Sequence, residues 1–111
     1  MELDRKLALK GRRLQILGAP AGLRLSLANG SGSEVGLLAF VHDLKALQKI
    51  ADVVVESAVA DRLTWVAYPK RGKLETDLNR DSLAAALKKR GVRPVSQIAI
   101  DETWSALRFR A

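Results

Sequence analysis

The stretch VSQIAIDETWSALRFR, Val95 to Arg110, decides the fold of this chain. It contains two runs typical of β-strands, Val95 to Ile100 and Thr103 to Arg110, separated only by Asp101 and Glu102. Two residues leave room for a tight hairpin and nothing else. The hairpin places an antiparallel strand in whatever sheet it joins. In the second run the side chains alternate between one face, with Ser105, Leu107 and Phe109, and the other, with Trp104, Ala106, Arg108 and Arg110.

Upstream of the hairpin, strand patterns alternate with helix patterns. The apolar runs Leu14 to Ala19, Val35 to Val41 and Arg62 to Pro69 predict buried strands. After the second run, apolar residues at three- and four-residue spacings predict a helix capped by Asp43 that ends near Ala60. After the third, a helix capped by Asn79 or Asp81 carries basic residues in its last turn, and Gly91 follows it.

This alternation predicts one α/β domain over residues 1–111. Right-handed crossovers between the strands imply a mostly parallel sheet in a three-layer sandwich, with an antiparallel C-terminal strand. The order of elements is similar to part of a class I methyltransferase-like, or Rossmann-like, fold. That analogy implies the spatial order first strand, Val35 to Val41, Arg62 to Pro69, Thr103 to Arg110, and finally Val95 to Ile100 at the edge.

Two N-terminal segments are left open by their patterns. The segment LDRKLALK, before Leu14, can form at most about two turns of helix. In the segment from Gly22 to Glu34, Leu23, Leu25 and Leu27 alternate as in a strand, although a position after a strand and a glycine turn suits a short helix. Both alternatives stay open for Leu23 to Leu27.

The composition excludes several classes of protein. The 111 residues contain no cysteine and one histidine, so disulfides and a Cys/His zinc site are excluded, and we expect no bound metal. The charged N-terminus resembles neither a signal peptide nor a membrane span, which predicts a cytoplasmic protein with no membrane partner. A net charge of +7 favours polyanions, although it is divided nearly evenly between the halves of the chain.

The last third of the chain resembles a family of small, uncharacterised bacterial proteins known only as a domain of unknown function. Members share a strand ending in WV-x-Y/W-P-K, then TDL-N-R-D, a helix, R-P-V and DETWSALRFR, and the corresponding residues here run from Leu63 to Arg110. The opening LALKGRRLQILGAP is also similar to the helix, turn and strand that begin the family pattern. The resemblance supports the fold and implies no activity.

Candidate binding residues follow from the predicted topology. Ligands of open α/β sheets bind beyond the carboxyl ends of the parallel strands, where the connecting loops meet. Asp101 and Glu102 belong to the hairpin at that same edge. The residues expected to shape this site are Gly18, Gly22, His42, Tyr68, Lys70, Asp101, Glu102 and Trp104.

None of these residues forms a recognisable catalytic or cofactor motif. The turn GAPAG, Gly18 to Gly22, lacks the three clustered glycines of a dinucleotide or adenosylmethionine loop, and Pro20 removes one N–H donor, so we expect no cofactor. His42 and Asp43 have no nucleophile in a recognisable motif. Adjacent acids such as Asp101 and Glu102 point to opposite faces of a strand. We expect instead that Asp101 or Thr103 hydrogen-bonds the hairpin backbone, or that one of the acids pairs with Arg93 or Arg108.

The sequence therefore favours a non-catalytic domain that binds a protein partner or an anionic ligand at the carboxyl edge of its sheet. One alternative is a nucleic-acid-binding protein that uses its basic surface, in which Trp65 or Trp104 could stack on a base instead of lying in the core. Another is a degenerate methyltransferase-like enzyme. A homodimer can also form if the edge strand Val95 to Ile100 is exposed.

Overall fold

The computed structural model describes residues 14–18, 36–70 and 78–111. The predictions for residues 1–13, for the segment from Gly22 to Glu34 and for most of the loop before Leu78 lie outside these residues. The described elements, in chain order, are β1 (Leu14–Leu17), β2 (Gly36–Phe40), α2 (Leu44–Val59), β3 (Thr64–Pro69), α3 (Arg80–Lys88), β4 (Arg93–Ala99) and β5 (Trp104–Arg110).

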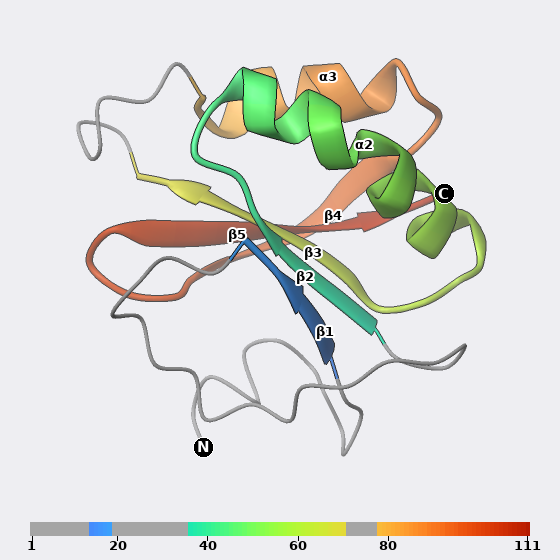
Figure 1. Ribbon diagram of the computed structural model, residues 1–111, viewed down its shortest axis with the longest axis horizontal. Coiled ribbons are helices and arrows are strands. Elements are labelled where there is room, and N and C mark those ends of the chain that lie inside the picture. Colours follow the sequence, from blue (N-terminus) through green and yellow to red (C-terminus); the bar gives the residue numbers. More distant parts are fainter. Residues whose placement is uncertain (1–13, 19–35, 71–77) are drawn as a thin grey trace.

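The strands form one five-stranded sheet in the order β1-β2-β3-β5-β4, which confirms the predicted spatial order (Figure 1). The chain is an α/β protein, but its sheet is mixed and the prediction of a mostly parallel sheet is wrong. The two parallel pairings, β1 with β2 and β2 with β3, align four residue pairs each, whereas β5 aligns five with β3 and six with β4. The reason is the length of the C-terminal hairpin, whose two strands are longer than any parallel strand.

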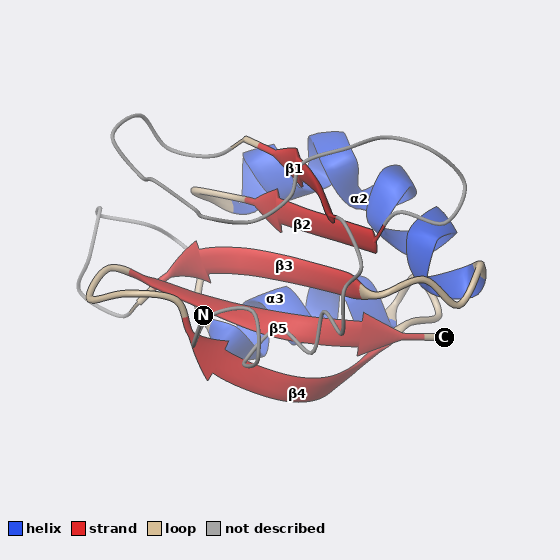
Figure 2. Cartoon of the chain, turned by 90° about the horizontal axis from the view of Figure 1, so that it is seen from below, coloured by secondary structure: helices blue, strands red, loops and turns tan. Residues whose placement is uncertain are grey.

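The helices α2 and α3 cover one face of the sheet (Figures 1 and 2). From α2, Leu47, Ala51, Val54 and Ala58 are buried against strand residues such as Val66 and Phe109. From α3, the buried residues are Leu83, Ala84 and Leu87. Burying this apolar face is the main stabilising contribution to the domain.

The opposite face of the sheet carries a second buried cluster without a helical member: Leu38, Phe40, Leu63, Trp65, Ala67, Trp104 and Ala106. Every residue of β2 and β3 is therefore buried, as expected for central strands. Because both described helices lie on the first face, the three-layer arrangement stays a prediction.

Helix boundaries follow the predicted capping residues. Asp43 Oδ1 accepts a hydrogen bond from the N–H of Ala46 at 2.8 Å, and Asn79 Oδ1 accepts one from the N–H of Ser82 at the same distance. Ser82 Oγ in turn accepts from the N–H of Asn79, so α3 begins with a reciprocal capping box. Of the two predicted caps for α3, Asn79 is the one used.

The strand β4 begins at Arg93, two residues before the predicted strand. Pro94 therefore lies inside a strand. Proline is tolerated there because β4 is at the edge of the sheet, where alternate backbone N–H groups point to solvent and have no partner strand. The register between β4 and β5 shifts between Pro94 and Ser96, as in a β-bulge. The strand is therefore irregular where it begins and regular toward the hairpin.

Candidate functional site

The carboxyl ends of β1, β2 and β3 lie at one edge of the sheet, together with the turn of the β4–β5 hairpin. The register pairs Leu17 with Ala39 and Phe40 with Ala67, and Pro69 lies opposite Trp104 of β5. We call this the carboxyl edge. The N-terminal ends of α2 and α3 belong to the same edge, because each helix follows directly on from a parallel strand or its loop.

Five of the predicted site residues lie in the connections at this edge: Gly18, His42, Lys70, Asp101 and Glu102. His42, Asp101 and Glu102 are exposed, and Lys70 is partly exposed. The backbone N–H of Lys70 donates to the carbonyl of Thr103 at 2.7 Å, which joins the exit of β3 to the hairpin. Gly22 lies outside the described residues, so its predicted role is untested.

The hairpin turn is organised by one carboxylate. Asp101 Oδ1 accepts hydrogen bonds from the N–H groups of Thr103 at 2.8 Å and Trp104 at 2.7 Å. Of the predicted alternatives, this confirms the one in which Asp101 hydrogen-bonds the hairpin backbone. The N–H groups of Ile100 and Asp101 both donate to the carbonyl of Trp104 and close the turn. Glu102, like Asp101, is exposed to solvent.

Gly18 has a structural reason to be glycine. Its φ is +68°, and a Cβ built on it would lie 2.8 Å from the carbonyl oxygen of Phe40 in the neighbouring strand β2. The residue therefore combines a left-handed backbone with a close approach between two chain segments. This geometry accounts for Gly18 without any bound ligand.

Tyr68 and Trp104, the two aromatic residues predicted for the site, lie on opposite faces of the sheet. Tyr68 belongs to the cluster under the helices, whereas Trp104 belongs to the cluster on the other face, where its ring meets Phe40 edge-to-face at 5.2 Å. Both side chains are buried. The two rings therefore point to opposite faces instead of toward each other. A core role for Trp65 and Trp104 is confirmed.

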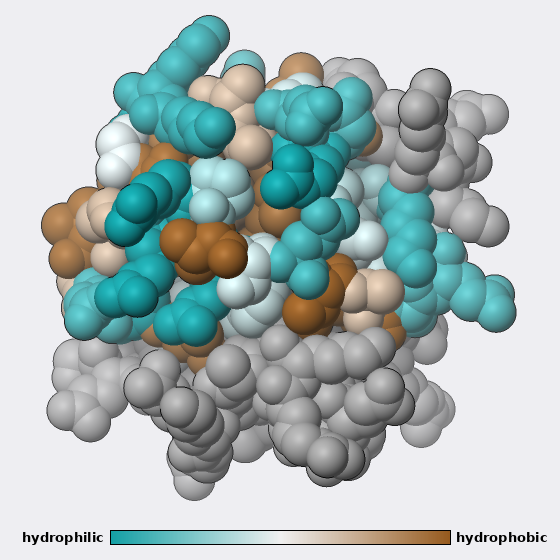
Figure 3. Space-filling view, turned by 180° about the vertical axis from the view of Figure 1, so that it is seen from behind, coloured by the Kyte–Doolittle hydropathy of each residue, from teal (hydrophilic) through white to brown (hydrophobic). Residues whose placement is uncertain are grey.

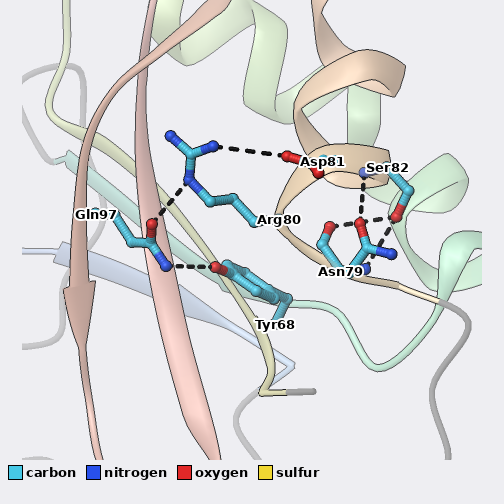
Figure 4. Close-up of polar contacts among 6 residues, drawn as sticks. All are labelled: Tyr68, Asn79, Arg80, Asp81, Ser82 and Gln97. Atoms are coloured by element: carbon cyan, nitrogen blue, oxygen red, sulfur yellow. Dashed lines mark hydrogen bonds and ion pairs between the residues drawn. The ribbon is translucent and has the colours of Figure 1, made fainter.

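Sequence reasoning missed a polar network around Tyr68 (Figure 4). Gln97 Nε2 donates to the Tyr68 hydroxyl at 3.0 Å, and Arg80 Nε donates to Gln97 Oε1 at 2.8 Å. An exposed ion pair of 3.6 Å joins Arg80 to Asp81. The predicted strand order already indicated that this contact was possible, because it places β5 between β3 and β4. Ser105 of β5 pairs with Tyr68 on one side and with Ala99 on the other, so side chains of β3 and β4 meet across it.

The Tyr68 hydroxyl loses its proton less readily than an exposed tyrosine does. Burial raises the pKa of Tyr68 above its ordinary value, while the positive charge of Arg80 and a hydrogen bond with Ser105 act in the opposite direction. At neutral pH the hydroxyl is therefore a proton-bearing structural group. No described residue near it has the geometry of an activated nucleophile or an acid–base pair.

We predict that Tyr68→Phe alters the pH dependence of stability above about pH 10. In the parent protein, the unfolded chain releases the phenolic proton at a lower pH than the folded chain, so the free energy of unfolding falls as the pH rises past that value. The variant has no phenolic proton to lose, so its free energy of unfolding does not fall in this way. The difference in the free energy of unfolding between parent and variant should therefore shrink with rising pH. Urea unfolding at neutral and alkaline pH measures it, and a constant difference would contradict the burial of this hydroxyl.

Among the described residues, no group of three or more His, Asp or Glu side chains is placed to hold a metal ion. Neither described helix combines the length and the apolar character needed to cross a membrane. Comparison of the chain with models of protein families, with curated proteins and with solved structures returned no match. The family resemblance of the C-terminal third therefore stays a prediction.

Proposed function

We propose that this chain is a small, non-catalytic, cytoplasmic α/β domain that binds a protein partner at the carboxyl edge of its sheet. The observation that supports it is the convergence of four connections from distant parts of the chain, carrying Gly18, His42, Lys70 and Glu102, on one edge. Polar loop residues held by a rigid sheet are a common arrangement for recognition.

The charges at this edge favour a protein over a small anion. Lys70 and His42 are accompanied by Asp43, Asp101 and Glu102, so no net positive field is available among these residues to attract an anion. A mixed set of charges matches the polar rim of a transient protein interface. The turn at Asp101 keeps Glu102 in place, which lowers the entropy lost on binding.

NMR spectroscopy of the isotope-labelled protein tests this proposal. On addition of extract from the source cells, we expect amide shifts at His42, Lys70 and Glu102, and we expect the charge exchange Lys70→Glu/Glu102→Lys to remove them without changing the net charge. The matched control is Lys49→Glu/Glu56→Lys, which exchanges two exposed charges of α2 outside the carboxyl edge. Shifts confined to the opposite end of the strands would refute the proposal.

The same experiment examines the enzyme alternative. Millimolar adenosylmethionine should leave all amide signals unchanged, because the turn Gly18 to Gly22 lacks the three clustered glycines of such a cofactor loop. Saturable shifts at Gly18 and His42 with this compound would replace the non-catalytic proposal by the methyltransferase-like one.

A further inference from the structure

The end of the sheet opposite the carboxyl edge gathers basic side chains. It includes the C-terminal end of α3, the start of β4 and the end of β5, which meet because α3 and β5 run toward this end and β4 starts from it. We call it the basic end and define it by Lys88, Lys89, Arg90, Arg93, Arg108 and Arg110. The three acids of the same stretch of chain, Asp81, Asp101 and Glu102, all lie at the carboxyl edge.

Cross-strand pairing makes this charge costly for the folded domain. Arg93 lies directly opposite Arg110 in the antiparallel pair of β4 and β5. Like charges in directly opposite positions destabilise a sheet. Among the described residues, two acids from elsewhere form ion pairs at this end: Asp61 with Arg110 at 3.5 Å, and Asp52 with Arg90. Both acids are more than four-fifths exposed. Exposed pairs of this kind contribute little.

The dipole of α3 accounts for only part of the positive charge at the basic end. Lys88 to Arg90 lie where α3 ends, and positive charge there interacts favourably with the helix dipole. Arg93 and Arg110 belong to strands and gain nothing from that dipole. Figure 3, which views the molecule from the side of β4, shows hydrophilic and hydrophobic side chains mixed over the described part of this face.

We infer that the basic end binds the phosphate backbone of duplex nucleic acid without reading its sequence. All five aromatic residues of the chain, Phe40, Trp65, Tyr68, Trp104 and Phe109, are buried, so none can stack on an unpaired base. What the basic end offers is charge, and a duplex presents phosphate charge at about one per 1.7 Å of its axis. This site is separate from the proposed carboxyl-edge function and does not depend on it.

Fluorescence anisotropy with a labelled 20-base-pair DNA duplex tests the inference. With three phosphates contacted, the affinity should fall about 40-fold between 50 and 200 mM salt, because bound counterions are released. Two duplexes of unrelated sequence should bind equally well. Single strands of the same length should bind more weakly. Sequence-dependent affinity, or tighter binding of single strands, would overturn the inferred mode.

A matched pair of variants distinguishes the contribution of the basic end to the affinity from that of the net charge of the protein. Lys89→Gln/Arg93→Gln removes two positive charges from the basic end and should lower the affinity at 100 mM salt at least about tenfold. Lys45→Gln/Lys49→Gln removes the same charge from exposed positions on α2 and should change it less than about twofold. Equal losses from both would refute a localised site.

If the first variant does not fold, as judged by its thermal unfolding transition, Lys88→Gln/Lys89→Gln replaces it with the same expected loss. Vesicles containing phosphatidylserine serve as a second polyanion. Binding to these vesicles without any binding to the duplex would identify a membrane surface as the partner of the basic end. It would overturn the assignment to nucleic acid.

Discussion

Trp104→Ala is expected to lower the free energy of unfolding by about 3–5 kcal/mol, the typical cost of truncating a large buried aromatic residue. Trp104 is 6% exposed and its ring contacts Phe40 edge-to-face. The substitution removes that aromatic contact and leaves a cavity between β2 and the hairpin. Because a domain of this size is stable by about 5–15 kcal/mol, the loss is a large share of the total. Urea unfolding followed by circular dichroism measures it.

Trp104→Phe is the matched variant. It keeps a ring opposite Phe40 and should cost about 1–2 kcal/mol, because only part of the buried volume is lost. If the Trp104→Ala protein were as stable as the parent but no longer bound its partner, Trp104 would be a binding residue and not a core residue.

Gly18→Ala is expected to lower the free energy of unfolding by about 3 kcal/mol. A left-handed backbone costs a residue with a Cβ about 1–2 kcal/mol, and here the added carbon also meets the Phe40 carbonyl oxygen at 2.8 Å. Since that oxygen belongs to the backbone of β2, one strand must move away from the other. Loss of the β1–β2 pairing would appear as faster amide exchange in β2.

Gly91→Ala separates the two contributions. Gly91 also has a positive φ, +92°, but a Cβ there would meet no atom within 4 Å. Only the backbone cost remains, and we expect about 1 kcal/mol. Equal effects at the two glycines would mean that the approach of Gly18 to Phe40 imposes no constraint.

Much of the described fold could be predicted because its signals are local. Asp43 and Asn79 start helices through hydrogen bonds within three residues, and the short spacing between two strand patterns allows only a hairpin. The spatial order of the strands also followed, since crossover rules leave few alternatives once the hairpin is placed.

The candidate site was harder to predict because it depends on which face each side chain occupies. Tyr68 and Trp104 both lie near the carboxyl edge, but Tyr68 pairs with Ser105, the neighbour of Trp104, so the two rings point to opposite faces. Side chains on a strand change faces at every residue, and an error of one position reverses the assignment. The network of Tyr68, Gln97 and Arg80 joins three elements and has no signature within any one of them.

The irregular start of β4 limits how this protein can assemble with itself. A homodimer through β4 stays a prediction, but Pro94 offers no N–H to an approaching strand, and the shift in register between Pro94 and Ser96 breaks the ladder beside it. Pairing between copies would thus be confined to the segment nearer the hairpin. Such a short contact can close a symmetric pair, yet it gives poor support to the continuous stacking from which fibrils grow.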